Sequence, residues 1–145
     1  MNKDPIHLLE LASEAAKKAY APYSKFRVGA CALYEDGSVY TGCNVENVSY
    51  GLTICAERSA ISAAVANGEH GGLVAIAIFS PDSELCFPCG ACRQWIIEFS
   101  DNAKIIVQDK TGKPVEVSIK ELLPNAEFMQ NVRQVLQVNN NELHP

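Results

Sequence analysis

The fold is decided by two short stretches, T-I-C-A-E-R at residues 53–58 and F-P-C-G-A-C-R-Q at residues 87–94. Each stretch opens a segment with the apolar spacing of a helix. Between the two helices, residues 73–80 form an almost continuous apolar run, which is typical of a strand buried on both faces. The succession of helix, buried strand and helix indicates an α/β domain with these two stretches at its centre.

Upstream of the first stretch, the sequence predicts a helix followed by a hairpin. The helix begins after Asp4 and runs to about Tyr20, where a nearby proline prevents continuation. Two strands, residues 26–34 and 38–45, flank an Asp-Gly turn signal. These elements add an antiparallel pair to one side of the sheet.

The two central helices are expected at residues 55–67 and 89–99. Thr53 is in position to cap the first of them. The second has four large apolar residues that are candidates to pack inward, namely Trp95, Ile96, Ile97 and Phe99.

The C-terminal part completes the architecture. Strands are expected at residues 104–108 and 115–117, and Ser118 opens a last helix with capping-box spacing. The element order predicts an α/β fold, a three-layer α/β/α sandwich with a five-stranded mixed sheet. Residues 1–128 are expected to form a single domain, and residues 129–145 a C-terminal tail that is helical and then frayed.

Composition limits the partners and the compartment. The net charge of −5 argues against nucleic acid, which needs clustered lysine and arginine. The longest apolar run, residues 73–79, is too short to span a bilayer, so no membrane partner is expected. The first residues lack a signal-peptide pattern, which favours a cytoplasmic location.

In a reducing compartment, six cysteines indicate metal binding or catalysis before disulfides. Cys31 and Cys43 are expected to be buried small hydrophobic residues on strands.

Three cysteines, Cys55, Cys89 and Cys92, are the predicted ligands of one zinc ion. Cys89 and Cys92 are three residues apart at a helix start, so their side chains share one face. Cys55 begins the other central helix, and a helix N-terminus favours the thiolate form. Three protein ligands leave a fourth position for water, which is the arrangement of a catalytic zinc site.

A closed structural site with four cysteine ligands is the alternative. The spacing of Cys86, Cys89 and Cys92 also suits zinc. Cys86, however, lies in the loop before the helix, and a structural zinc gives no reason for Glu57 to stand beside Cys55. The open site with three ligands is therefore favoured.

Arg58 follows Cys55 by one helical turn. Three thiolates on Zn²⁺ leave a net charge of −1, which opposes ionisation of a bound water. Hydrogen bonds from a guanidinium to the thiolates would withdraw part of that charge. The sequence equally allows Arg58 to be a surface ion-pair residue.

Glu57 is the predicted catalytic residue. A zinc-bound water gives a nucleophile near neutral pH, and a neighbouring carboxylate can take its proton. Zinc-bound hydroxide would attack an amino-bearing ring carbon while Glu57 shuttles protons to a ring nitrogen and then to the leaving amine. The expected reaction is hydrolytic deamination with release of ammonia.

With both motifs in this order, the chain resembles the cytidine deaminases of the small homotetrameric type. The resemblance covers roughly residues 5–128 and includes A-P-Y-S-K-F-R-V-G-A at 21–30, G-C-N-V-E-N at 42–47, S-Y-G-L-T-I at 49–54 and E-L-L-P at 121–124. It implies a cytidine deaminase-like fold and a homotetramer with sites near the subunit interfaces. It also implies a zinc ion in each subunit, and conversion of cytidine and 2′-deoxycytidine to uridine and 2′-deoxyuridine in pyrimidine salvage.

The resemblance also assigns residues to the substrate. In the family, residues matching Asn44 and Glu46 hydrogen-bond the ribose 3′-hydroxyl, and the residue matching Phe26 lines the base pocket. The backbone of Ala56 and the carboxyl of Glu57 would read the base edge, and Arg58 corresponds to the arginine beside the zinc. Without the resemblance, the polar pair would be read as a loop that caps a strand end, and the phenylalanine as a core residue.

The end of the resemblance contains a departure. Family members commonly end in L-L-P-G-A-F, where the phenylalanine stacks on the base in a neighbouring subunit. This chain reads L-L-P-N-A-E-F at residues 122–128, so Glu127 stands before Phe128. Phe128 is the candidate for that stacking role. Beyond it, Val132, Val135 and Leu136 fit one helical stripe.

Two rival functions remain open. A different small-molecule deaminase, similar to the blasticidin-S deaminases, would share both zinc motifs. A non-catalytic module stabilised by zinc would have the closed site. The N-x-E-N sequence at residues 44–47 favours a substrate with a free ribose over the first rival.

Overall fold

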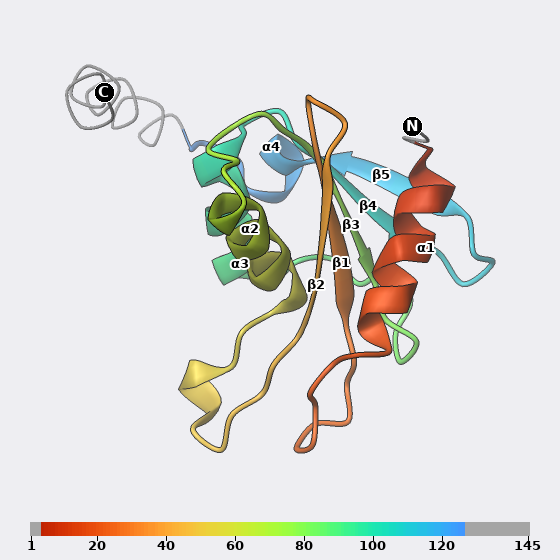
Figure 1. Ribbon diagram of the computed structural model, residues 1–145. Helices are drawn as coiled ribbons and strands as arrows, with labels where there is room; N and C mark the ends of the chain where they lie inside the picture. The colour runs from red at the N-terminus through yellow and green to blue at the C-terminus, as the bar shows by residue number, and fades with distance from the viewer. Residues whose placement is uncertain (1–3, 127–145) are drawn as a thin grey trace.

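The computed structural model describes residues 4–126, and the chain forms one mixed sheet between two layers of helices (Figure 1). The strands are β1 (Gly29–Tyr34), β2 (Val39–Cys43), β3 (Leu73–Phe79), β4 (Lys104–Gln108) and β5 (Pro114–Ser118). Their order in the sheet is β2-β1-β3-β4-β5, and only β3 and β4 run parallel. The predicted five-stranded mixed sheet is therefore confirmed.

The helices are α1 (Pro5–Ala16), α2 (Ala56–Ala66), α3 (Gly90–Phe99) and the short α4 (Ile119–Leu122), with a 3-10 turn η1 (Tyr50–Leu52). In Figure 1, α1 lies on one face of the sheet, and α2, α3 and α4 lie on the other. Two separate clusters of buried apolar residues follow from this arrangement, one on each face of the sheet. The predicted three-layer sandwich is confirmed.

Two glycines allow helices to lie unusually close to the sheet, one on each face. A Cβ atom added at Gly29 would lie 1.9 Å from the carbonyl oxygen of Ala12 in α1. A Cβ atom added at Gly42 would lie 2.4 Å from the backbone nitrogen of Ala60 and 2.7 Å from the carbonyl oxygen of Ala56. Gly42 thus sets how closely the first turn of α2 approaches β2.

Tertiary contacts shorten two of the predicted elements. The first helix ends at Ala16 instead of near Tyr20, because Tyr20 pairs with the segment after β2. Its N–H donates to the Asn44 carbonyl at 3.0 Å, and its carbonyl accepts from the N–H of Glu46 at 2.8 Å. The strand expected from residue 26 begins only at Gly29, because Asn44 binds the backbone of the residues before it.

Three predictions about single side chains were wrong. Thr53 does not cap α2, because it ends the 3-10 turn and Cys55 occupies the N-cap position. Trp95 does not pack inward and is 40% exposed, because α3 buries the face that carries Ile96 and Ile97 and leaves Trp95 at its margin. Cys43 is only half-buried, because β2 is an edge strand.

None of the helices within residues 4–126 has the length and apolar character needed to cross a membrane. The predicted tail, including Phe128 and the stripe of Val132, Val135 and Leu136, lies outside the described residues.

Candidate metal centre and active site

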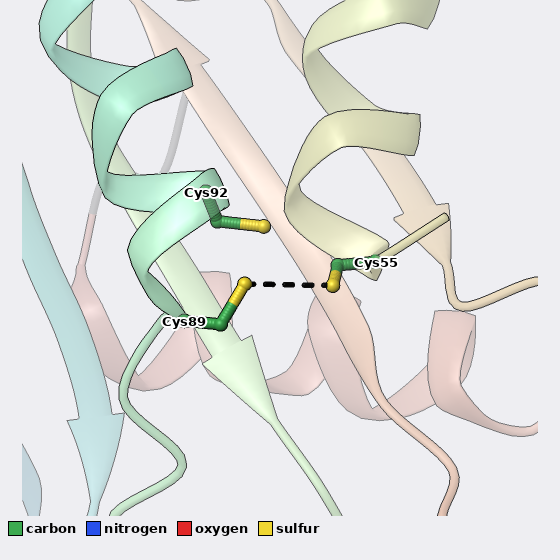
Figure 2. Close-up of side chains that lie close together, drawn as sticks. All are labelled: Cys55, Cys89 and Cys92. Atoms are coloured by element: carbon green, nitrogen blue, oxygen red, sulfur yellow. Dashed lines mark hydrogen bonds between the residues drawn. The ribbon is translucent and has the colours of Figure 1, made fainter. Parts of the chain in front are cut away.

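Three thiols meet where α2 and α3 begin (Figure 2). Cys55 is the N-cap residue of α2, Cys89 is the N-cap residue of α3, and Cys92 lies in the first turn of α3. The three Sγ atoms lie within 4.8 Å of one another, and those of Cys55 and Cys89 are 3.8 Å apart. The structure therefore brings together all three predicted ligands.

The spacing of these sulfur atoms fits zinc. A tetrahedral ion with Zn–S bonds of about 2.3 Å places two sulfur ligands about 3.8 Å apart. This is the separation found between Cys55 and Cys89. All three cysteines are free of disulfides, and neither N-cap cysteine uses its side chain to cap its helix. The thiols are thus available to a metal, and Cys55, Cys89 and Cys92 would hold it.

Arg58 lies against this group of thiols. Its Nη2 atom donates a hydrogen bond to Sγ of Cys55 at 3.4 Å. Within residues 4–126, Arg58 forms no ion pair with a carboxylate, and its Nε atom is buried without a hydrogen-bond partner. The pKa of Cys55 is lowered to about 5, chiefly by a hydrogen bond from Cys92 and further by Arg58. The sequence allowed Arg58 either to bind the thiolates or to form a surface ion pair, and the structure supports hydrogen bonding to the thiolates.

Glu57 is a buried carboxyl group next to the ligands. Its side chain is only 4% exposed, and its Oε2 atom lies 3.6 Å from Sγ of Cys92. Burial raises the pKa of Glu57 to about 7. Its position on the first turn of α2 follows from Cys55 being the N-cap, so the C-x-E spacing places ligand and carboxylate side by side.

Asn44 and Glu46 fasten the loop before β1 to the segment after β2. Oδ1 of Asn44 accepts from the N–H of Val28 at 2.8 Å, and its Nδ2 donates to the Phe26 carbonyl at 2.7 Å. Oε1 of Glu46 accepts from the N–H groups of Tyr23 and Ser24 at 2.9 and 3.1 Å. Hydrogen bonds, the largest from the side chain of Ser24, lower the pKa of Glu46.

The same segment is tied to the zinc ligands. Val45 and Ile54 exchange two backbone hydrogen bonds, each 2.9 Å long, and Cys55 follows directly. Asn44, Glu46 and Phe26 are therefore linked by backbone contacts to the start of α2. The arrangement places a polar loop and an aromatic residue, 38% exposed, in one connected structure with the metal centre.

Comparison with known proteins identifies the family. Residues 2–108 match the family model described as the cytidine and deoxycytidylate deaminase zinc-binding region. The chain belongs to this deaminase family.

The chain is also similar to individual members of the deaminase family. It is 44% identical over 120 residues to a cytidine deaminase of Halalkalibacterium halodurans, covering 82% of this chain and 90% of that protein. It is 46% identical over 115 residues to a cytidine deaminase of Mycobacterium tuberculosis, covering 79% and 83% of the two chains. A crystal structure of cytidine deaminase from Burkholderia pseudomallei matches with a TM-score of 0.80 and 44% identity, over 87% of this chain and 99% of that one.

In this deaminase, Cys86 does not join the ligand group. Among the described residues, only Cys55, Cys89 and Cys92 lie close enough together to share a metal. Cys86 instead packs against the core, and burial raises the pKa of its thiol to about 11. Cys31 is fully buried on β1, as predicted. The geometry favours the open site over the closed one.

Two residues that position the deaminase site were missed by sequence reasoning. Gly42 permits the close approach of α2, and nothing in its local pattern signals this role. Arg93 donates through Nε to the Pro88 carbonyl at 2.8 Å and through Nη1 to the Leu122 carbonyl at 3.0 Å. It therefore holds the loop before Cys89 against α4. The position of Arg93 directly after the ligand Cys92 was the sequence signal that could have indicated this role.

Proposed function

We propose that this deaminase hydrolyses cytidine to uridine and 2′-deoxycytidine to 2′-deoxyuridine, with release of ammonia. One observation carries the proposal: three thiols within 4.8 Å of one another stand beside a buried carboxyl group, with Oε2 of Glu57 3.6 Å from Sγ of Cys92. The names of the similar proteins agree with this reaction class.

The residues of this chain have separate tasks in the proposed reaction. When bound, zinc would supply a nucleophile near neutral pH by lowering the pKa of a coordinated water. Glu57 takes one proton from the attacking water and delivers it to the ring nitrogen, and then takes the remaining proton of that water and delivers it to the departing amine. One water is consumed and one ammonia is released for each nucleoside. Arg58 withdraws charge from the Cys55 thiolate and so favours this chemistry.

In the proposal, the substrate is bound by residues of the loop before β1, of the segment after β2 and of the first turn of α2. Asn44 and Glu46 hold the ribose 3′-hydroxyl, Phe26 lines the base pocket, and the backbone of Ala56 reads the base edge together with Glu57. The hydrogen bond from the Asn44 side chain to the Phe26 carbonyl keeps Phe26 in place for this role.

The proposal extends to assembly and context. We place the catalytic domain at residues 1–128, in a cytoplasmic homotetramer that serves pyrimidine salvage, with Phe128 stacking on the base in a neighbouring subunit. Exposed apolar residues in the segment that leads to Cys55 support an assembly, among them Val48 at 78%, Tyr50 at 75% and Leu52 at 65% exposure. Sedimentation would test the tetramer: a monomer at the concentrations used for activity would contradict it.

The first test is the ultraviolet absorbance of cytidine mixed with the purified protein, with and without a zinc chelator. The cytidine band should be replaced by that of uridine, and the chelator should abolish the change. Parallel reactions with 2′-deoxycytidine and with cytosine test the need for the ribose. If a protein with one zinc per chain converts neither nucleoside, the proposed substrate is wrong.

A further inference from the structure

A second apolar surface lies on α3, outside the zinc site. It is a hollow of about 310 Å³ lined by Gln94, Trp95, Glu98 and Phe99, and it includes none of the metal ligands. Trp95 is 40% exposed there and Phe99 is half-buried. Tryptophan is enriched at contact surfaces, and here it lies at a hollow with a second aromatic side chain.

The described chain ends beside this helix. Nη1 of Arg93 in α3 donates to the carbonyl of Leu122 in α4, and Ala126 packs at the edge of the core cluster that includes Ile96 and Ile97 (Figure 1). Residues 127–145 continue from this point. Residues 127 and 128 span about 7 Å when extended, and ten residues at helical rise span about 15 Å, which is the length of α3, so a helix over residues 129–138 is long enough to run along it.

The pattern of this segment fits the hollow. At helical spacing one face carries only apolar residues, and the opposite face is polar except for Val138. The apolar face has Met129, Val132, Val135 and Leu136, and the polar face has Gln130, Asn131, Gln134 and Gln137. Arg133 borders the apolar face.

The charges of Glu98 and Arg133 also favour the C-terminal segment as the cover of the hollow. Glu98 is exposed at the hollow and forms no ion pair with any residue between 4 and 126. An arginine at the border of the apolar face would be opposite this carboxylate. We propose that residues 129–138 cover the hollow on their own chain, with Val132, Val135 and Leu136 against Trp95 and with Arg133 beside Glu98.

The chain contains its own reporter, because Trp95 is the only tryptophan. Acrylamide quenching of its fluorescence is compared in the full chain, in Leu136→Asp and in the matched control Gln134→Asp, which adds the same charge to the polar face. Leu136→Asp should raise the quenching constant roughly twofold and shift the emission to the red, because it returns Trp95 to solvent. Gln134→Asp should match the unchanged chain. Equal quenching in the unchanged chain and in Leu136→Asp would overturn the proposal.

A charge exchange tests the placement. Glu98→Arg alone should raise the quenching constant, and adding Arg133→Glu should restore it. A double variant no better protected than the single one would contradict the contact. Protection that is lost on dilution would assign the cover to a second copy of the chain and overturn the same-chain arrangement. Zinc content and deaminase activity should be equal in all these variants, since none of them changes the catalytic site.

Discussion

Nη2 of Arg58 donates a hydrogen bond to Sγ of Cys55 at 3.4 Å, across one turn of α2. The hydrogen bond raises the pKa of Arg58 above its ordinary value, so the guanidinium stays positively charged. A fixed positive charge beside a thiolate reduces the electron density that three sulfur ligands give to a metal. The relation between these two residues therefore connects the fold of α2 to the acidity of the metal centre.

Replacing Arg58 by Gln should lower both kcat and zinc affinity by about 10–100-fold, the range for a group that orients a ligand. Steady-state kinetics and competition with a chromophoric chelator would measure the two effects. Arg58→Lys is the matched control, because it keeps the charge but loses the planar fork. Its kcat and its zinc affinity should lie between those of the unchanged enzyme and those of Arg58→Gln. Unchanged kinetics in Arg58→Gln would show that the contact has no role in the reaction.

Replacing Glu57 by Gln should retain zinc and the fold while lowering kcat by about 10²–10⁴-fold, because the amide cannot carry protons. Glu57 is not one of the three grouped ligands, so the metal should stay. Elemental analysis and circular dichroism confirm that the variant is folded and loaded. Turnover close to that of the unchanged enzyme would contradict the proposed role of Glu57 in proton transfer.

Replacing Asn44 by Ala should reduce both stability and substrate affinity. Two hydrogen bonds are lost, a buried one from Val28 N–H and a partly buried one to the Phe26 carbonyl, and a buried group left unpaired costs about 1–3 kcal/mol. The variant should unfold at lower denaturant concentration and show a raised KM. Asn44→Asp keeps the acceptor for Val28 and should be less destabilised. A raised KM with unchanged stability would mean that only substrate contact matters.

Gly42 and Gly29 provide a matched pair of substitutions on opposite faces of the sheet. Both alanine variants should lose about 1–3 kcal/mol in the free energy of unfolding, because each added Cβ meets helix backbone. Only Gly42→Ala should also weaken zinc binding, by up to about 10–100-fold, since it displaces the first turn of α2 beside Cys55. Equal zinc affinity in the two variants would show that the close approach at Gly42 does not position the ligands.

Replacing Cys86 by Ser should leave one zinc per chain. The three-thiol group does not include Cys86, and burial keeps its thiol protonated near neutral pH. Metal analysis of the purified variant gives the answer directly. Loss of the metal would revive the closed site with four ligands.

The metal centre could be predicted from the sequence because its information is local. Cys55 and Glu57 are two residues apart, Cys89 and Cys92 are three apart, and each pair begins a helix whose apolar spacing is plain. Strand β4 was predicted with its observed bounds for the same reason, since a short apolar run between polar residues needs no distant partner.

The errors arose where distant residues decide the structure. Tyr20 leaves the helical path to pair with a segment around Val45, and Asn44 binds the backbone at Phe26 and Val28. Neither contact has a local sequence signal. Trp95 was expected inward because periodicity shows which residues are apolar, but not where the margin of a buried face lies.

The two ends of the sheet described above are unequal. The zinc ligands, Glu57 and the bonds of Asn44 all gather where β1 begins and β3 ends. The opposite end, with the hairpin turn at residues 35–38 and the loops at 67–72 and 100–103, carries none of them (Figure 1). Foreign chain can therefore be added at that end without touching the chemistry, and the hairpin turn, where Glu35 and Asp36 are exposed, is a natural place for an inserted tag or for new termini.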